Sequence, residues 1–171
     1  MMYYFAYGSN LHPVRLTDRV PSAELVGVAM HPHHRLTFHK RSHDGSSKCN
    51  IFPSGSVSDV IHGAIYKIKP EHKPALDRFE GKGNGYLDNQ ITLSCHGNDY
   101  RCFTYFAQTA HITDNLMPYH WYKTLVLLGA RYLKFPDSYI ATIEEIESMQ
   151  DPDLARRKEM DALLERIIEH C

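Results

Sequence analysis

The chain has 171 residues, 43% of them hydrophobic, and a net charge of −1. This length and apolar content suffice for one domain with its own core, and the near-zero charge argues against binding to nucleic-acid phosphates. The opening apolar run is much shorter than the ~20 residues of a membrane-spanning helix, and no positively charged leader precedes it. We therefore expect a single cytoplasmic domain over residues 1–171, with neither nucleic acid nor membrane as a partner.

The cysteines are spread along the chain without a Cys-x-x-Cys pair, at Cys49, Cys95, Cys102 and Cys171. Disulfide frameworks are typical of small secreted domains, and this sequence carries no export signal. We therefore expect the cysteines to be reduced thiols.

The beginning of the chain joins an aromatic segment to a small polar turn. Residues 3–7 have strong β propensity, and the following Gly8-Ser9-Asn10 has the composition of a turn in which φ can become positive. Backbone N–H groups in such a turn can converge on an anion or a carbonyl oxygen. Because Pro13 would lie in the first turn, the pattern predicts a helix over residues 11–20. The turn is thus a candidate ligand-binding floor, the alternative being an ordinary connection between a strand and a helix.

Strand patterns dominate the first two thirds of the chain and helical patterns the last third, which predicts an α+β fold without internal repeats. The further expected strands cover residues 23–29, 34–39, 48–52, 60–68, 86–95 and 100–107. The last two strands are expected to form a hairpin with its turn at residues 96–99, a pairing that brings Cys95 near Cys102. Residues 41–47, rich in serine and charge, predict a mobile surface loop.

The last predicted helix begins near Asp151-Pro152 and carries an apolar stripe at spacings of three and four residues. The stripe consists of Leu154, Met160, Leu163, Leu164, Ile167 and Ile168. Such a stripe usually packs on the core of its own domain, although it could also form a seam between two copies. The sequence is therefore compatible with a monomer or a homodimer.

A short helix over residues 70–80 is followed by a segment with three glycines, residues 81–85. Glycines there allow left-handed conformations and a close approach of the backbone to a ligand. Glu80 would lie at the helix C-terminus, where the aligned peptide dipoles disfavour negative charge. If Phe79 and Tyr86 also shield it from water, its pKa rises toward the range of a useful general base. Glu80 is therefore the candidate base, against the simpler reading of a solvated helix-end glutamate.

The order of these segments resembles the γ-glutamylcyclotransferase-like superfamily. Tyr7-Gly8-Ser9-Asn10-Leu11 after an N-terminal aromatic strand is similar to the first motif of that family, and Phe79-Glu80-Gly81 with Tyr86 downstream is similar to its catalytic segment. Further segments follow in the family's order, at residues 34–38, 49–54, 62–66, 102–105 and 122–130.

The resemblance implies a small mixed-sheet β-barrel flanked by helices and an enzyme that needs neither metal nor cofactor. In the implied reaction, the α-amine of a small γ-glutamyl substrate attacks its own γ-carbonyl, which releases 5-oxoproline and an amino acid or amine. The resemblance also implies that Glu80 is the general acid/base. The implied substrate-binding residues are Tyr7, Gly8, Ser9, Asn10, Leu11, Tyr86, Tyr105 and Tyr122.

Three alternatives remain open at this stage. The first is a binding module that keeps the fold and recognises a γ-glutamyl or carboxylate ligand without turnover. The second makes Ser9 a covalent nucleophile, although no Gly-x-Ser-x-Gly motif is present. The third is a metal site at His31, His33 and His34, which lacks a fourth ligand nearby. Within the enzyme reading, Gly8-Ser9-Asn10 differs from the Gly-Ser-Leu form of the glutathione-degrading branch, which disfavours glutathione as the substrate.

Overall fold

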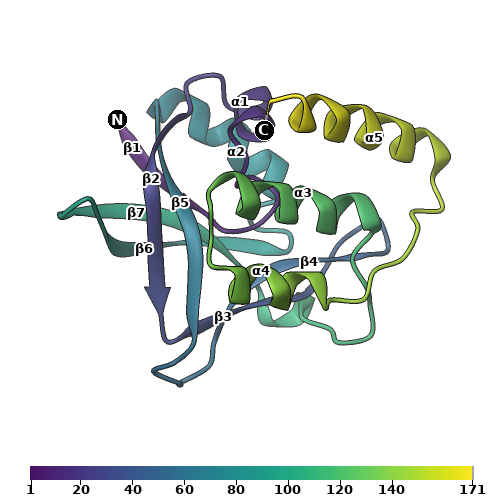
Figure 1. Ribbon diagram of the computed structural model, residues 1–171, viewed down its shortest axis with the longest axis horizontal. Coiled ribbons are helices and arrows are strands. Elements are labelled where there is room, and N and C mark those ends of the chain that lie inside the picture. The colour runs from purple at the N-terminus through teal and green to yellow at the C-terminus, as the bar shows by residue number, and fades with distance from the viewer. Residues whose placement is uncertain (171) are drawn as a thin grey trace.

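The computed structural model describes residues 1–170, so Cys171 lies outside the described part. The expected α+β class is confirmed, with a five-stranded mixed sheet, a two-stranded ribbon and five α-helices (Figure 1). The strands are β1 (Met2–Ala6), β2 (Glu24–Pro32), β3 (His34–Arg41), β4 (Ser47–Pro53), β5 (Val60–Ile68), β6 (Tyr86–Cys95) and β7 (Asn98–Ala107). The helices are α1 (Pro13–Arg19), α2 (Lys73–Glu80), α3 (His120–Tyr132), α4 (Asp137–Glu144) and α5 (Leu154–Ile168), with short 3-10 turns at Pro70–His72 and Thr109–His111.

The central strand of the larger sheet is β1, and the strand order is β2-β5-β1-β7-β6. β1 runs antiparallel to β5 and parallel to β7, so that the first residues of the chain lie in the middle of the core. The sheet curls strongly enough to bring its two edge strands close together, since a Cβ added to Gly27 of β2 would lie 2.6 Å from the Cys95 sulfur of β6. The edge strands are not paired with each other, so the mixed sheet forms a half-barrel, as an incomplete version of the small barrel that the resemblance implies.

The ribbon of β3 and β4 packs across the open end of this half-barrel. The buried Asn50 on β4 accepts a hydrogen bond from the backbone N–H of Ala107 on β7 through its Oδ1, at 2.7 Å. A β-bulge interrupts the pairing of β3 with β4 between Phe38 and Lys40. Because a bulge changes the direction of the side chains around it, this irregularity determines where Lys40 points.

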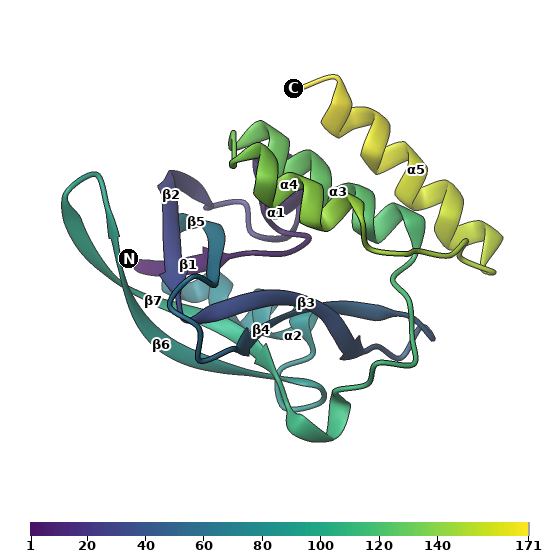
Figure 2. The ribbon, with the colours of Figure 1, turned by 60° about the horizontal axis from the view of Figure 1, so that its bottom comes forward.

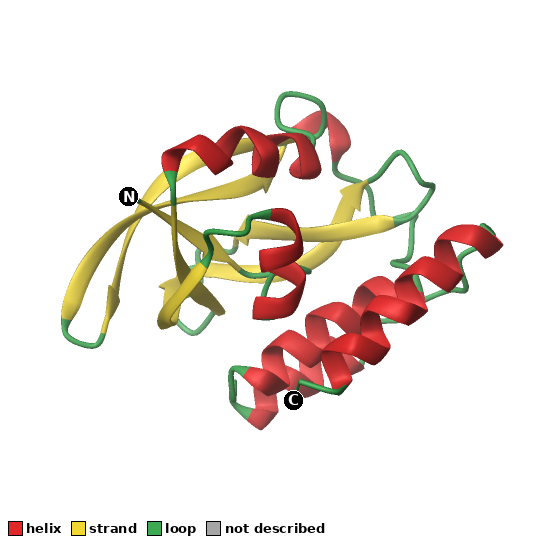
Figure 3. Cartoon of the chain, turned by 90° about the horizontal axis from the view of Figure 1, so that it is seen from above, coloured by secondary structure: helices red, strands yellow, loops and turns green. Residues whose placement is uncertain are grey.

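Helices α3, α4 and α5 form a layer on one side of the strands, as Figures 2 and 3 show. α3 buries Trp121, Tyr122 and Leu125. α5 packs against α3 on the outer side of this layer (Figure 2). In the apolar stripe of α5, Met160, Leu163 and Ile167 are buried, whereas Leu154 and Ile168 at its two ends are exposed. No helix within residues 1–170 combines the length and the hydropathy that crossing a bilayer requires.

The hairpin of β6 and β7 is tighter than expected. Its register pairs Cys95 with Asn98, which leaves only two residues, His96 and Gly97, in the turn. Cys102 therefore lies opposite Ile91, so Cys95 and Cys102 are on adjacent strands without being direct cross-strand partners. The two thiols are still close enough for Cys95 to add to the rise in the pKa of Cys102 that burial causes. Cys49, Cys95 and Cys102 are free thiols. Two-residue turns with positive φ match the twist of the strands, and both His96 and Gly97 have positive φ.

Residues 41–47, predicted to be a mobile surface loop, form a turn that is partly buried and fixed by hydrogen bonds. Ser46 and Ser47 are fully buried. The Asp44 carboxylate accepts hydrogen bonds from the backbone and hydroxyl of Ser46, at 3.0 and 2.7 Å. The Tyr119 hydroxyl donates to the Asp44 carbonyl oxygen at 2.5 Å. This turn is therefore fixed against α3 and can form part of a binding site.

Candidate active site

A small recess lies where the end of β1, the end of α2 and the inner face of the sheet meet. Its volume is about 20 Å³, which is room for about one water molecule. It is lined by Tyr4, Tyr7, Gly8, Ser9, Asn10, Cys49, Glu80, Tyr86, Tyr105 and Tyr122. The residues singled out in the sequence are thus brought together from segments far apart in the chain, with the exception of Leu11.

Glu80 enters the recess from the last position of α2. The helix ends there because Gly81 adopts the left-handed conformation, with φ of 65°, and its N–H bonds back to the Arg78 carbonyl at 3.1 Å. The Glu80 side chain is only 16% exposed. Its Oε1 accepts a hydrogen bond from Asn10 Nδ2 at 2.7 Å, and Arg19 Nη1 lies 3.7 Å from the same oxygen. The carboxylate is therefore held by the turn that follows β1 and by the last residue of α1.

Burial raises the pKa of Glu80 above its usual value, since removal from water disfavours the charged form. The Arg19 guanidinium, the Asn10 hydrogen bond and the Lys40 ammonium act in the opposite direction, but burial outweighs them. A carboxylate whose pKa is raised accepts a proton more readily than an ordinary glutamate and can return it, as a general acid/base must. The local sequence explains this placement, because the glycines after Glu80 end the helix and leave its side chain at the recess.

The turn after β1 has a different geometry from the one expected. Neither Gly8, Ser9 nor Asn10 has a positive φ, so the glycine is favoured there by limited space and not by its backbone conformation. A Cβ on Gly8 would lie 3.1 Å from Cys49 Cβ. The backbone N–H groups of Ser9 and Asn10 donate no hydrogen bond to any other described residue. Because Ser9 and Asn10 line the recess together with Glu80, these two donors are suited to a carbonyl or carboxylate oxygen of a ligand.

Leu11 lies on the other side of this turn. Its side chain is fully buried and packs against Gly129 of α3, outside the lining of the recess. Its carbonyl oxygen accepts a hydrogen bond from the Tyr66 hydroxyl at 2.6 Å. Leu11 therefore anchors the turn to the core, and its side chain has no direct access to a ligand in the recess.

Three tyrosines around the recess, Tyr7, Tyr86 and Tyr122, are fixed by hydrogen bonds to the backbone. The Tyr7 hydroxyl donates to the Tyr105 carbonyl oxygen at 2.6 Å, and the Tyr86 hydroxyl donates to the Cys49 carbonyl oxygen at 2.5 Å. The Tyr122 hydroxyl accepts from the Cys49 N–H at 3.0 Å. Burial raises the pKa of each of these phenols, so they stay neutral and provide a rigid apolar and hydrogen-bonding wall.

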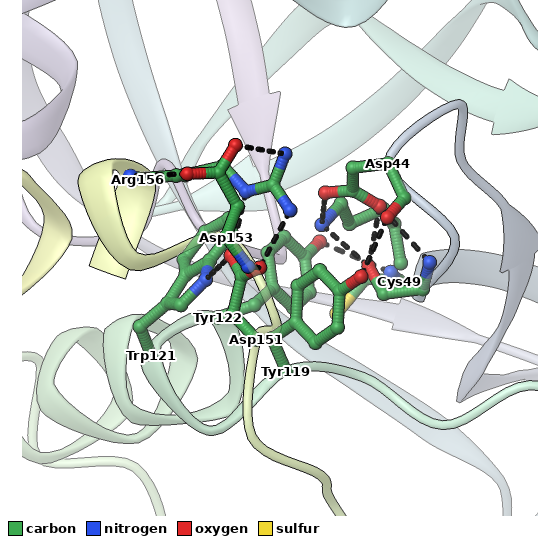
Figure 4. Close-up of polar contacts among 10 residues, drawn as sticks. Asp44, Cys49, Tyr119, Trp121, Tyr122, Asp151, Asp153 and Arg156 are labelled. Atoms are coloured by element: carbon green, nitrogen blue, oxygen red, sulfur yellow. Dashed lines mark hydrogen bonds and ion pairs between the residues drawn. The ribbon is translucent and has the colours of Figure 1, made fainter.

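A polar cluster behind this wall joins α3, α5 and the turn between β3 and β4, as Figure 4 shows. The Asp151 carboxylate is fully buried and receives hydrogen bonds from Arg156, at 2.5 and 2.6 Å, and from Trp121 Nε1, at 2.9 Å. These donors hold the pKa of Asp151 well below its usual range. The cluster fixes the start of α3, which carries Tyr122 into the recess.

A second cavity of about 110 Å³ adjoins the recess and shares Ser9, Glu80, Tyr86 and Tyr122 with it. Its remaining lining is rich in cations, with Arg15, Arg19, Lys40, Ser42, Lys48, Phe79 and Trp121. Sequence reasoning did not identify this outer cavity, because its basic residues come from α1 and from both sides of the β3–β4 hairpin. No motif or regular spacing connects these residues in the chain.

The histidine cluster is held together by contacts between its own rings. The rings of His31 and His34 stack at a centroid distance of 4.1 Å. Burial, reinforced by His34, lowers the pKa of His31 to about 4. Residues 1–170 contain no group of three or more potential ligands placed to hold a metal ion.

Comparisons with known proteins agree with this geometry. Residues 4–124 match the family model described as Gamma-glutamyl cyclotransferase, AIG2-like. The gamma-glutamylcyclotransferase of Bos taurus is 30% identical over 151 residues, covering 84% of this chain and 78% of the bovine protein. The Homo sapiens gamma-glutamylcyclotransferase is 28% identical with the same coverage of both chains. A solved structure titled Gamma-glutamyl cyclotransferase superposes with a TM-score of 0.81 at 24% identity, covering 96% of this chain and 98% of the other. The chain therefore belongs to the AIG2-like gamma-glutamyl cyclotransferase family.

Proposed function

We propose that the protein is a γ-glutamylcyclotransferase that releases 5-oxoproline from a small γ-glutamyl compound, with Glu80 as the general acid/base. The observation that carries this proposal is the position of the Glu80 carboxylate, 2.7 Å from Asn10 Nδ2 and beside the two unused N–H groups of the turn. Family membership supports the reaction class, and the raised pKa of Glu80 supports its role.

In the proposed mechanism, Glu80 first takes a proton from the α-ammonium group of the substrate. The resulting amine attacks the γ-carbonyl carbon of the same glutamyl group, which forms the five-membered lactam and places negative charge on the carbonyl oxygen. The backbone N–H groups of Ser9 and Asn10 are the candidate donors to this oxygen. The oxyanion then collapses, the bond from the γ-carbon to the leaving nitrogen breaks, and Glu80 returns its proton to that nitrogen. The attacking nitrogen gives up its second proton, which the released amine takes up as it becomes an ammonium group, so that a neutral lactam remains.

Positioning contributes as much to this reaction as proton transfer. Holding an amine against a carbonyl of the same molecule can supply several of the roughly 7–11 kcal/mol available from orientation, while a positioned proton carrier adds about 10²- to 10⁴-fold. The fixed tyrosine wall, which includes Tyr86, Tyr105 and Tyr122, is suited to hold the glutamyl chain folded. No step requires a metal, a cofactor or a covalent nucleophile, so Ser9 contributes through its backbone.

The recess is smaller than a glutamyl group, so substrate entry requires its boundary with the outer cavity to widen. Both cavities share Glu80 and Ser9. We infer that the glutamyl part occupies the enlarged recess and that the leaving group extends into the outer cavity.

The proposed function is tested by mass spectrometry for 5-oxoproline after incubation with a panel of γ-glutamyl amino acids, γ-glutamylamines and glutathione. We expect product from at least one of the first two classes and weaker turnover of glutathione. Absence of product across the panel, together with measurable binding of a γ-glutamyl compound, would instead identify the protein as a binding module.

We further propose that residues 1–171 form one domain, that it acts in the cytoplasm, and that it binds no nucleic acid. The helical layer and both sheets pack around one continuous hydrophobic core, which supports the single domain. Limited proteolysis that leaves residues 1–170 uncut would agree with this organisation, whereas two separately stable fragments would contradict it. Light scattering distinguishes the monomer from the homodimer.

A further inference from the structure

Lys40 is a buried cation whose ammonium is in direct contact with no carboxylate in the described part of the chain. The residue is 5% exposed, and within residues 1–170 its ammonium makes neither a hydrogen bond nor an ion pair. Its Nζ lies 4.5 Å from the centroid of the Tyr86 ring and borders the outer cavity. Burial lowers the pKa of Lys40, while the carboxylates of Glu80 and Asp44 raise it. A buried ammonium that lacks an acceptor is costly, so its retention at a cavity indicates that a ligand supplies the acceptor.

Two local features place Lys40 there. The bulge in β3 puts Lys40 directly opposite Lys48 of β4, and both side chains reach the outer cavity. Like charges opposite each other destabilise a strand pair. Lys48 is neutralised by Asp44 at 2.8 Å, whereas Lys40 is not. The second feature is Gly85, with φ of 130°, where an added Cβ would lie 2.8 Å from both Cε and Nζ of Lys40.

Arg15 of α1 adds to the positive charge of the same cavity. It forms no ion pair within residues 1–170, and its Nε is buried without a hydrogen-bond partner. Arg19, by contrast, is engaged with Asn10 at 3.1 Å and with Glu80. Of the four cations in the outer cavity, two are therefore compensated by protein carboxylates and two, Arg15 and Lys40, are left for a ligand.

We propose that Lys40 is a specificity-determining residue whose ammonium binds a carboxylate on the leaving group. This inference rests on the proposed function and extends it. The glutamyl part is expected in the recess, so the cavity that contains Lys40 receives the other half of the substrate. A leaving amino acid brings a carboxylate to this cavity, while a leaving amine does not. The protein should therefore prefer γ-glutamyl amino acids over γ-glutamylamines.

The test compares two substrates that differ only by this carboxylate, γ-glutamylalanine and γ-glutamylethylamine. Wild-type protein should have the higher kcat/KM for γ-glutamylalanine. Lys40→Met should lower that value by about 10- to 100-fold, mainly through KM, as expected for a lost charge-assisted hydrogen bond. The same variant should lower γ-glutamylethylamine turnover much less, because the only effect shared by the two substrates is the rise in the Glu80 pKa when the nearby ammonium is removed. Lys40→Arg keeps the charge and should retain part of the preference, and the exposed Lys69→Met is the matched control without effect.

Equal losses for both substrates would overturn the inference, because Lys40 would then act on the glutamyl group or on Glu80. No loss for either substrate would overturn it as well. Melting temperature separates a folding defect from a binding defect: removal of an unpaired buried charge should not lower it, and a marked decrease would contradict the unpaired state of Lys40.

Calorimetric binding of the same two compounds to Glu80→Gln protein, with and without Lys40→Met, gives the comparison without turnover. If wild-type protein forms no 5-oxoproline but the binding preference disappears with Lys40→Met, the proposed reaction fails while the carboxylate site stands. If turnover occurs and the preference is unchanged by Lys40→Met, the proposed carboxylate-binding role of Lys40 is wrong, while the proposed reaction is supported.

Discussion

The recess and the outer cavity share Glu80, yet they differ in how their charges are balanced. In the recess, the single carboxylate is held by Asn10 and approached by Arg19. In the outer cavity, Lys40 and Arg15 feel nearby carboxylates only at a distance and form no ion pair among the described residues. A charge held by protein groups keeps its position before substrate arrives, which suits a proton carrier. A charge left unpaired gains its partner on binding, which suits recognition.

If the site were chosen by cavity size alone, a different part of the molecule would be selected. A groove of about 430 Å³, lined among others by His31, Phe52 and Phe106, is far larger than the recess and shares no lining residue with it. Its histidine of lowered pKa is neutral near pH 7, and nothing in it combines a titratable group with free donors. The small recess is the better candidate because it holds a perturbed carboxylate, two unused N–H groups and a rigid wall.

The largest expected effect on stability comes from breaking a balanced charge. Arg156→Met removes two hydrogen bonds to the fully buried Asp151 and leaves its carboxylate unpaired. We expect a loss of about 3 kcal/mol in the free energy of unfolding. Because the pKa of Asp151 is held low in the folded state, this contribution is present above its unfolded pKa and disappears as the pH falls.

Urea unfolding at neutral and at acidic pH measures this loss. Lys40→Met is the informative comparison, since it removes an unpaired cation and should cost little or no stability. Equal destabilisation by both variants would contradict the difference between the two cations, namely that Arg156 is paired with a buried carboxylate and Lys40 is not.

A smaller effect is expected from Asn10→Ala, which removes the hydrogen bond to Glu80. This bond favours the charged carboxylate, so its loss should raise the pKa of Glu80 further. The acidic limb of the profile of kcat/KM against pH should therefore move to higher pH, with about a tenfold decrease in rate at neutral pH. Asn89→Ala, at an exposed position on β6, serves as the control. If the acidic limb does not move, the hydrogen bond from Asn10 has no influence on the ionisation of Glu80, which would contradict this prediction.

The smallest expected effect is a pH-dependent gain in stability from Glu80→Gln. The folded pKa of Glu80 lies above its ordinary value of 4.5, so its contribution to stability is fully present below the unfolded pKa and is lost as the pH rises through the folded pKa. At neutral pH the neutral variant should therefore melt at or slightly above the wild-type temperature, and this difference should shrink toward pH 4.5. A variant that is less stable at neutral pH would show that Arg19 and Asn10 outweigh burial.

Local chemistry made much of the fold predictable. The bounds of β5 and β6 agree with the expected strands, because both segments combine β-branched or aromatic residues with clear turn residues at their ends. The end of α2 was also predictable from Gly81, since a left-handed glycine stops a helix in a characteristic way. That prediction was what placed Glu80 at a helix terminus next to a flexible backbone.

The outer cavity could not be predicted in the same way. The direction of Lys40 depends on a bulge in β3, and one extra residue in a strand leaves no pattern in the surrounding sequence. The buried Ser47 donates its N–H to the carbonyl oxygen of Met117, a residue much later in the chain. Leu11 illustrates the same limit, because only the packing against Gly129 shows that its side chain faces away from the recess.

The most direct test of the role of Glu80 is the rate of 5-oxoproline release by Glu80→Gln protein, measured together with binding of the same γ-glutamyl amino acid. The exposed Glu71→Gln is the matched control. We predict at least about a hundredfold loss of turnover with binding retained, since the amide keeps the shape of the side chain but cannot accept the proton. Turnover near the wild-type rate would contradict the account and remove Glu80 from the mechanism.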